Sequence, residues 1–234
     1  MKDKQTLDLT LATTTFAKAP QTEEELIINA NSLTGRSLQQ IASELGLQVP
    51  SDQKHAKGWV GEMIEIYLGA TASSLPEPDF QHIGVELKTL PLDQRGKPKE
   101  TTYVCTVSLH GHIGDSWDNS AVKRKLNRVL WVPIEADPSI PLSKRRIGNP
   151  FIWSPSNKQE TVLRIDWEEH MDMIAMGEVN RLSSRQGKYL QIRPKAANAS
   201  ALSQTNMENG EIGMTLPRGF YLRTNFTQIL LNEQ

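Results

Sequence analysis

The sequence has 234 residues, enough for one large domain or two small ones with a substantial core. Hydrophobic residues make up 38% of it and charged residues 23%, which fits a folded globular protein and excludes an intrinsically disordered one. Cys105 is the only cysteine, so an internal disulfide and a cysteine-based zinc site are excluded. Residues 1–20 lack the apolar core of a signal peptide, and no apolar run reaches bilayer-spanning length, so we expect a cytoplasmic protein.

Charge is distributed unevenly along the chain. Residues 1–120 hold 10 Lys and Arg against 16 Asp and Glu, whereas residues 121–234 hold 16 against 11. The two halves therefore carry net charges of −6 and +5, which together give the −1 of the whole chain. Such asymmetry is compatible with a division of labour between the halves, but on charge alone ordinary solvated surface is the better explanation.

Capping patterns predict two short helices near the start. Thr22 with Glu25, and Ser37 with Gln40, each precede an apolar run with the spacing of a capping box. A third helix is predicted over residues 57–70, where apolar residues repeat at helical spacing.

Strands are predicted at several places in the remainder of the chain. They cover residues 83–90, 101–109, 128–135, 150–154 and 187–195. A long helix is expected over residues 159–176, and the C-terminal segment predicts a strand or loop that enters a short helix capped by Thr224 or Asn225. Helices and strands without regular βαβ alternation indicate an α/β or α+β fold.

Asp79, Glu86 and Lys88 follow the pattern Asp-x6-Glu-x-Lys. In a strand, Glu86 and Lys88 lie on the same face, roughly 7 Å apart, within reach of a shared ion or water. Phosphodiester hydrolysis needs a hard cation to neutralise the phosphate and acidify a bound water, and Mg²⁺ prefers carboxylate oxygens. Asp79 and Glu86 could hold that ion, with the backbone carbonyl of Leu87 as a third oxygen. Lys88 could orient the water and offset developing negative charge.

This pattern also has an ordinary explanation. Glu-x-Lys pairs are common on exposed strands, so the pattern alone does not establish a nuclease site. The apolar residues Ile83, Val85 and Leu87 nevertheless predict a strand at the centre of its sheet, where charged side chains need a reason.

Glu65 is a further candidate carboxylate, on the third predicted helix. Gly61 and Gly69 lie four residues before and after it, so no side chain is expected to shield it on that helical face. Each glycine costs a helix roughly 1 kcal/mol relative to alanine, so the pair needs an explanation. The alternative is that the two glycines permit close packing of the helix against a strand and that Glu65 is merely solvated. Glu62, the competing candidate on this helix, is not flanked in this way by a glycine on both sides.

Basic segments lie in the second half of the chain, at residues 123–128, 144–146 and 181–195. Lysine and arginine of this kind neutralise phosphates and release counterions from nucleic acid. Arg193, close to Lys195 at the end of a predicted strand, could reach guanine edges, and Tyr221 could contact a base. Taken one at a time, each basic cluster is better explained by solubility, and Tyr221 is better explained by core packing.

Five segments taken together resemble the MutH family of DNA mismatch repair endonucleases. They are KGWVGEMIEIYLGA, DFQHIGVELKTLP, KRKLNRVLWVPIE, YLQIRPKAANA and TLPRGFYLRTNFT. The resemblance runs from about residue 20 to about residue 230 and is more specific than the short acidic pattern that it contains. It implies a restriction-endonuclease-like α/β fold with a mixed central sheet flanked by helices, in a single endonuclease domain over residues 1–234. A metal-binding catalytic arm (20–120) and a DNA-reading arm (121–234) would surround a DNA cleft.

The resemblance also implies a role for each candidate residue. Asp79 and Glu86 would be metal ligands, Lys88 the catalytic lysine, Glu65 the additional acidic residue and Lys125 a basic residue near the scissile phosphate. The DNA-binding set contains Arg193, Lys195, Tyr221 and Lys57, of which the first three match positions that read GATC and its methylation.

The activity that the resemblance implies is a magnesium-dependent nick in the unmethylated strand of hemimethylated GATC sites, with Mn²⁺ or Ca²⁺ able to replace Mg²⁺ in binding. The partners would be double-stranded DNA and ATP-bound MutL, with MutS upstream, and the protein would be a monomer away from membranes. A stand-alone GATC restriction endonuclease and a catalytically silent GATC-binding module are the alternatives.

Overall fold

The computed structural model describes residues 18–51, 53–72, 76–111, 116–195 and 202–234. The helices are α1 (Glu23–Asn31), α2 (Leu38–Glu44), α3 (Gln53–Leu68), α4 (Ala121–Leu126), α5 (Asn157–Ala175) and α6 (Thr224–Asn232). The strands are β1 (Glu86–Leu92), β2 (Thr102–Thr106), β3 (Val129–Glu135), β4 (Phe151–Trp153), β5 (Leu190–Pro194), β6 (Ser203–Asn206), β7 (Ile212–Thr215) and β8 (Arg218–Leu222). The α/β class predicted from the sequence is confirmed. None of the helices described has the length and apolar character needed to cross a membrane.

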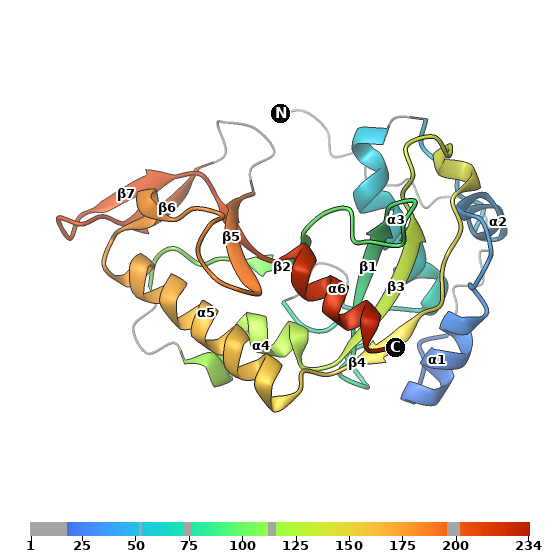
Figure 1. The fold of residues 1–234 in the computed structure, drawn as a ribbon, viewed down its shortest axis with the longest axis horizontal. Helices are drawn as coiled ribbons and strands as arrows, with labels where there is room; N and C mark the ends of the chain where they lie inside the picture. The colour runs from blue at the N-terminus through green and yellow to red at the C-terminus, as the bar shows by residue number, and fades with distance from the viewer. Residues whose placement is uncertain (1–17, 52, 73–75, 112–115, 196–201) are drawn as a thin grey trace.

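The strands form two three-stranded sheets and one hairpin. The first sheet is mixed, because β1 runs parallel to β3, whereas β4 runs antiparallel to β3. The second is antiparallel, with β8 between β2 and β5, and the β6–β7 hairpin is inserted between β5 and β8. Helices α1 to α3 gather around β1 and β3 at one end of the molecule, whereas α5, β5 and the hairpin lie at the other (Figure 1).

Strand β3 separates two hydrophobic cores. Its residues from Val129 to Ile134 are all buried, as a strand covered on both faces requires. Val129 and Trp131 pack into a core with α5, α6 and the second sheet, whereas Leu130 and Val132 pack into a core with α1, α2 and α3. The alternation of side chains along one strand therefore joins the two halves of the protein.

The predicted helix caps are confirmed at α2, confirmed in part at α1 and wrong at α6. Ser37 and Gln40 form the expected reciprocal capping box of α2. Thr22 caps α1 by accepting from the Glu25 N–H at 3.2 Å, but the Glu25 carboxylate accepts instead from the N–H of Gln21. The prediction for α6 was wrong: Arg223 occupies its N-cap, with no side-chain cap, because β8 continues to Leu222 and leaves a single residue before the helix.

A buried carboxylate on α5 fixes the start of β5. Asp166 is only 4% exposed and accepts from the backbone N–H groups of Lys188 at 2.8 Å, Tyr189 at 2.6 Å and Leu190 at 2.8 Å. Because Asp166→Ala leaves these donors without their acceptor, we expect it to lower the free energy of unfolding by about 3 kcal/mol in urea denaturation. Glu168→Ala on the same helix removes only an exposed ion pair with Arg164, and should cost less than about 1 kcal/mol. Equal losses in the two variants would contradict this account.

Candidate active site

Glu86 and Lys88 lie side by side at the start of β1, as the alternation predicts. Glu86 is only 2% exposed, and its Oε1 accepts a hydrogen bond from Lys88 Nζ. Its Oε2 accepts a second bond, at 2.9 Å, from Lys125 Nζ on α4. Burial raises the pKa of Glu86, while the positive charge of Lys88 acts in the opposite direction. The pKa of Lys88 is raised overall, because attraction to Glu86 and Asp79 outweighs burial, so its ammonium group stays charged.

The surroundings of β1 differ from the prediction in one respect. The strand order β1-β3-β4 places β1 at the edge of its sheet, so the expectation of a central strand was wrong. Glu86 is buried nevertheless, because α3 packs against β1 and Lys125 reaches the carboxylate from α4. Packing of helices against the strand therefore replaces a second neighbouring strand.

Asp79 is fixed next to Glu86 by the backbone. Its side chain is buried, and Oδ2 accepts from the N–H of Leu87 at 2.8 Å. The Asp79 carbonyl accepts from the N–H groups of Thr71 at 2.9 Å and Ala72 at 3.2 Å, which hold the loop in place. Asp79 and Glu86, seven residues apart in sequence, thus lie close together at the start of β1.

Glu65 on α3 belongs to the same electrostatic cluster. Burial, and then the negative charge of Asp79, raise its pKa to about 7, and Glu86 acts in the same direction. Together with Gly61, Lys88 and Tyr103 it lines a cavity of about 240 Å³. A Cβ at Gly61 would meet no atom within 4 Å, so this glycine leaves space beside Glu65. Gly69 plays no such part: it lies beyond the last residue of α3 with φ of 75°, and its left-handed backbone suits the end of a helix.

The raised pKa of Glu65 predicts a cost to stability in the metal-free protein. A carboxyl whose pKa is higher in the folded state contributes stability fully below its unfolded pKa, near 4.5, and that contribution is lost as pH rises through about 7. We therefore expect Glu65→Gln to raise the free energy of unfolding at pH 8 in EDTA by about 1–2 kcal/mol and to have little effect at pH 4.5. Urea denaturation at the two pH values measures this, and an equal effect at both would contradict it.

The donor set fits a hard divalent cation. Glu65, Asp79 and Glu86 place several carboxylate oxygens in one buried region, where mutual repulsion helps to raise the pKa of Glu65. In the conformation described, no three Asp, Glu, His or Cys side chains among the described residues form a ready metal site. Two of the carboxylates are already engaged: lysines donate to both oxygens of Glu86, and a backbone N–H donates to one oxygen of Asp79.

The second sheet brings together the side chains proposed to read DNA. Arg193 on β5 lies over the ring of Tyr221 on β8, at 5.8 Å from its centroid, and donates to Thr101 Oγ1 at 2.8 Å. The ring of Tyr221 meets that of Tyr103 on β2 edge-on at 5.4 Å. Lys195 Nζ lies 3.2 Å from the centroid of the Tyr103 ring. Three residues named from the sequence are therefore neighbours; the side chain of the fourth, Lys57, lies outside the part of the chain that is described.

Sequence reasoning missed Tyr103. This residue joins the two groups of candidates, because it contacts Tyr221 and Lys195 and also lines the cavity of Glu65 and Lys88. The alternation in residues 101–109 placed Tyr103 in a strand, but only the pairing of Tyr103 with Tyr221 across β2 and β8 brings it to the site.

Gly219 allows the two tyrosine rings to converge. A Cβ at this position would lie 2.9 Å from Tyr103 Cε2 and 3.1 Å from Tyr221 Cε2, closer than ordinary van der Waals contact. We therefore expect Gly219→Ala to displace both rings and to lower the free energy of unfolding by about 1–2 kcal/mol. Chemical shifts of the two tyrosine rings by NMR, with urea denaturation, measure the effects. Unshifted rings would contradict the prediction.

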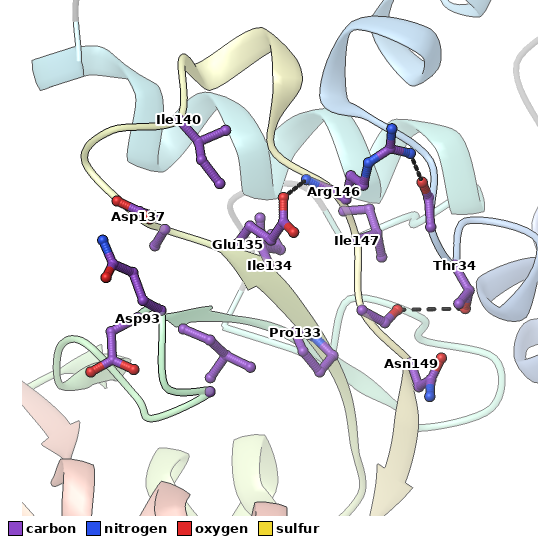
Figure 2. A pocket seen from close by; sticks show the side chains of 16 residues that line it. Thr34, Asp93, Pro133, Ile134, Glu135, Asp137, Ile140, Arg146, Ile147 and Asn149 are labelled. Carbon is purple, nitrogen blue, oxygen red and sulfur yellow. Dashed lines mark hydrogen bonds between the residues drawn. The ribbon is translucent and has the colours of Figure 1, made fainter.

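A larger cavity, of about 610 Å³, lies at the far end of the parallel β1–β3 pair. Figure 2 shows its lining, where Glu135 Oε2 accepts from the Arg146 N–H at 2.9 Å. Asp93 accepts from the N–H groups of Arg95 and Lys97, and Asp137 from that of Ser139. Asp93 and Asp137 are engaged in local turns, Glu135 is engaged by a backbone N–H, and no lysine lines the cavity, so it lacks the acid–ammonium combination found at Glu86.

The mixed sheet, with helices packed on it and Glu86 and Lys88 on its edge strand, defines an α/β protein of the restriction-endonuclease-like class. Residues 68–166 match the family model described as DNA mismatch repair enzyme MutH. The DNA mismatch repair proteins MutH of Escherichia coli O6:K15:H31 (strain 536 / UPEC) and Escherichia coli (strain K12 / DH10B) are each 53% identical to the chain over 212 residues, covering 91% of this chain and 93% of the relative. The chain belongs to the MutH family.

Proposed function

We propose that the protein is a Mg²⁺-dependent DNA endonuclease of mismatch repair that nicks the unmethylated strand at hemimethylated GATC sites. Membership of the MutH family supports the coarser part, a mismatch repair endonuclease. We further propose that ATP-bound MutL activates it, with MutS upstream, and that it acts as a monomer in the cytoplasm.

The observation that carries the proposal is the buried cluster around Glu86. Lys88 and Lys125 both donate to its carboxylate, and Asp79 is held one residue away through the Leu87 N–H. Buried charges are costly unless they are paired, and a stable fold does not need so many of them at one strand end. Their concentration beside a cavity is typical of a catalytic centre.

Each residue of the cluster has a proposed task. Asp79 and Glu86, with Glu65 and the Leu87 carbonyl, would hold Mg²⁺, which when bound supplies charge neutralisation at the phosphate and a more acidic water. Lys88 keeps its ammonium charged beside Glu86 and would stabilise the negative charge that develops on the phosphate. Lys125 brings a second ammonium to the same place from α4.

The face of the second sheet would supply specificity. The guanidinium of Arg193 is planar and exposed, so it can donate two hydrogen bonds to guanine in the major groove. A methyl group on adenine N6 adds bulk and removes a hydrogen from the same groove. A Tyr221 that packs closely against this amine would reject the methylated base by steric and desolvation costs.

A plasmid-nicking assay with one hemimethylated GATC site tests the proposal. We expect weak nicking with Mg²⁺ alone, a strong increase with MutL and ATP, and cuts confined to the unmethylated strand. Efficient cutting of both strands of unmethylated DNA without a partner would instead establish the stand-alone restriction endonuclease. Binding of GATC without any cleavage, even with MutL, would establish the silent binding module.

A further inference from the structure

Lys125 makes two contacts that join separate parts of the protein. It lies on α4, which packs against β2 of the second sheet, and its Nζ reaches Glu86 on the first sheet at 2.9 Å. The same Nζ donates to the backbone carbonyl of Glu77 at 2.6 Å, two residues before Asp79. Lys125 is only 9% exposed, so this ammonium is held among protein atoms.

These contacts compete with a divalent cation for Glu86. Lys88 engages Oε1 and Lys125 engages Oε2, so both oxygens already have a positively charged partner. A cation that binds either oxygen competes with the neighbouring ammonium group for the space and the negative charge there. Lys88 lies two residues from Glu86 on the same strand, whereas Lys125 belongs to a different element, α4, so the contact of Lys125 with Glu86 is the one that can be broken without a change in β1.

We propose that Lys125 is a displaceable internal counter-ion: it neutralises Glu86 in the metal-free protein and is released from Glu86 and the Glu77 carbonyl when a divalent cation binds. Its ammonium then becomes available to a phosphate oxygen of the substrate. Metal loading and phosphate binding are thereby coupled through one side chain. This inference rests on the proposed function, because it assumes that Glu86 ligates a metal ion.

Calorimetric titration of the DNA-free protein with Mn²⁺ tests the competition. We expect Lys125→Met, which keeps the length of the side chain without its charge, to bind Mn²⁺ about tenfold more tightly than the unchanged protein. Lys123→Met is the matched control, since Lys123 lies on the same helix but pairs with Asp118 at 2.7 Å and Glu160 at 3.0 Å. The control should leave the affinity unchanged. Equal or weaker binding by Lys125→Met would overturn the inference.

Loss of a positive charge alone could tighten binding, so a second measurement follows the displacement itself. NMR of the lysine Nζ groups in the unchanged protein should show Lys125 protected from hydrogen exchange without metal and unprotected at saturating Ca²⁺ or Mg²⁺, which replace Mn²⁺ here because they are diamagnetic. Lys88 should stay protected throughout. Continued protection of Lys125 in the metal-bound protein would overturn the inference. Absence of any metal binding by the unchanged protein would count against the proposed function itself, so the two failures are distinguishable.

Discussion

Replacement of Lys88 by alanine is expected to lower the rate of magnesium-dependent nicking by about a thousandfold, and Glu86→Ala should be at least as damaging. Lys88 lies beside Glu86 with its side chain only 11% exposed, and its raised pKa keeps the ammonium charged where negative charge would develop on the phosphate. Alanine removes that charge and leaves Glu86 with Lys125 as its ammonium partner. Single-turnover nicking of a hemimethylated GATC duplex, with MutL and ATP, measures the rate.

Binding and folding controls separate a catalytic defect from a general one. Fluorescence anisotropy in Ca²⁺ should show that Lys88→Ala binds the duplex within about threefold of the unchanged protein, because phosphate contacts elsewhere carry most of the affinity. Lys97→Ala, at an exposed lysine beyond the end of β1, should leave both nicking and binding unchanged. A Lys88→Ala protein that folds normally and still nicks at near the normal rate would remove Lys88 from the catalytic centre.

Replacement of Tyr221 by alanine is expected to reduce the preference for hemimethylated over fully methylated GATC by about tenfold or more. The ring of Tyr221 packs against both Arg193 and Tyr103, so its loss removes the surface that would exclude the N6-methyl group and also frees Arg193. Nicking rates on hemimethylated, fully methylated and unmethylated duplexes measure the preference.

Two further variants refine the test of Tyr221. Tyr221→Phe keeps the ring and removes only the hydroxyl, so comparison with Tyr221→Ala separates steric exclusion from hydrogen bonding. Tyr189→Phe is a matched control, because the half-buried Tyr189 stacks on Phe226 of the core, with ring centroids 4.5 Å apart, and does not belong to the Tyr221 cluster. If both variants at Tyr221 discriminate as well as the control, Tyr221 does not read methylation.

Local patterns in the sequence were sufficient for most of the longer elements and for part of the site. Period-two alternation placed Glu86 and Lys88 on one face, and in the structure the two side chains are hydrogen-bonded to each other. The Ser37–Gln40 pair identified a capping box from four residues. Such features depend on residues that are neighbours in the sequence, so they can be predicted well from the sequence alone.

Features that depend on distant segments were not predictable in the same way. The edge position of β1 follows from which strands pair, and the contact of Lys125 with Glu86 joins residues 39 positions apart. Tyr103 and Gly219 matter because β2 pairs with β8, which no local pattern encodes. The six-residue helix α4 is too short to give a clear periodic signal, and its sequence was interpreted only as a basic segment.

Anomalous scattering from crystals grown with Mn²⁺ and a hemimethylated GATC duplex tests the central claim most directly. We predict a manganese peak within coordination distance of carboxylate oxygens of both Asp79 and Glu86, with the Lys88 ammonium beside it. A peak bound elsewhere, such as among Asp93 and Asp137 of the larger cavity, or the absence of any peak while DNA is bound, would contradict the account.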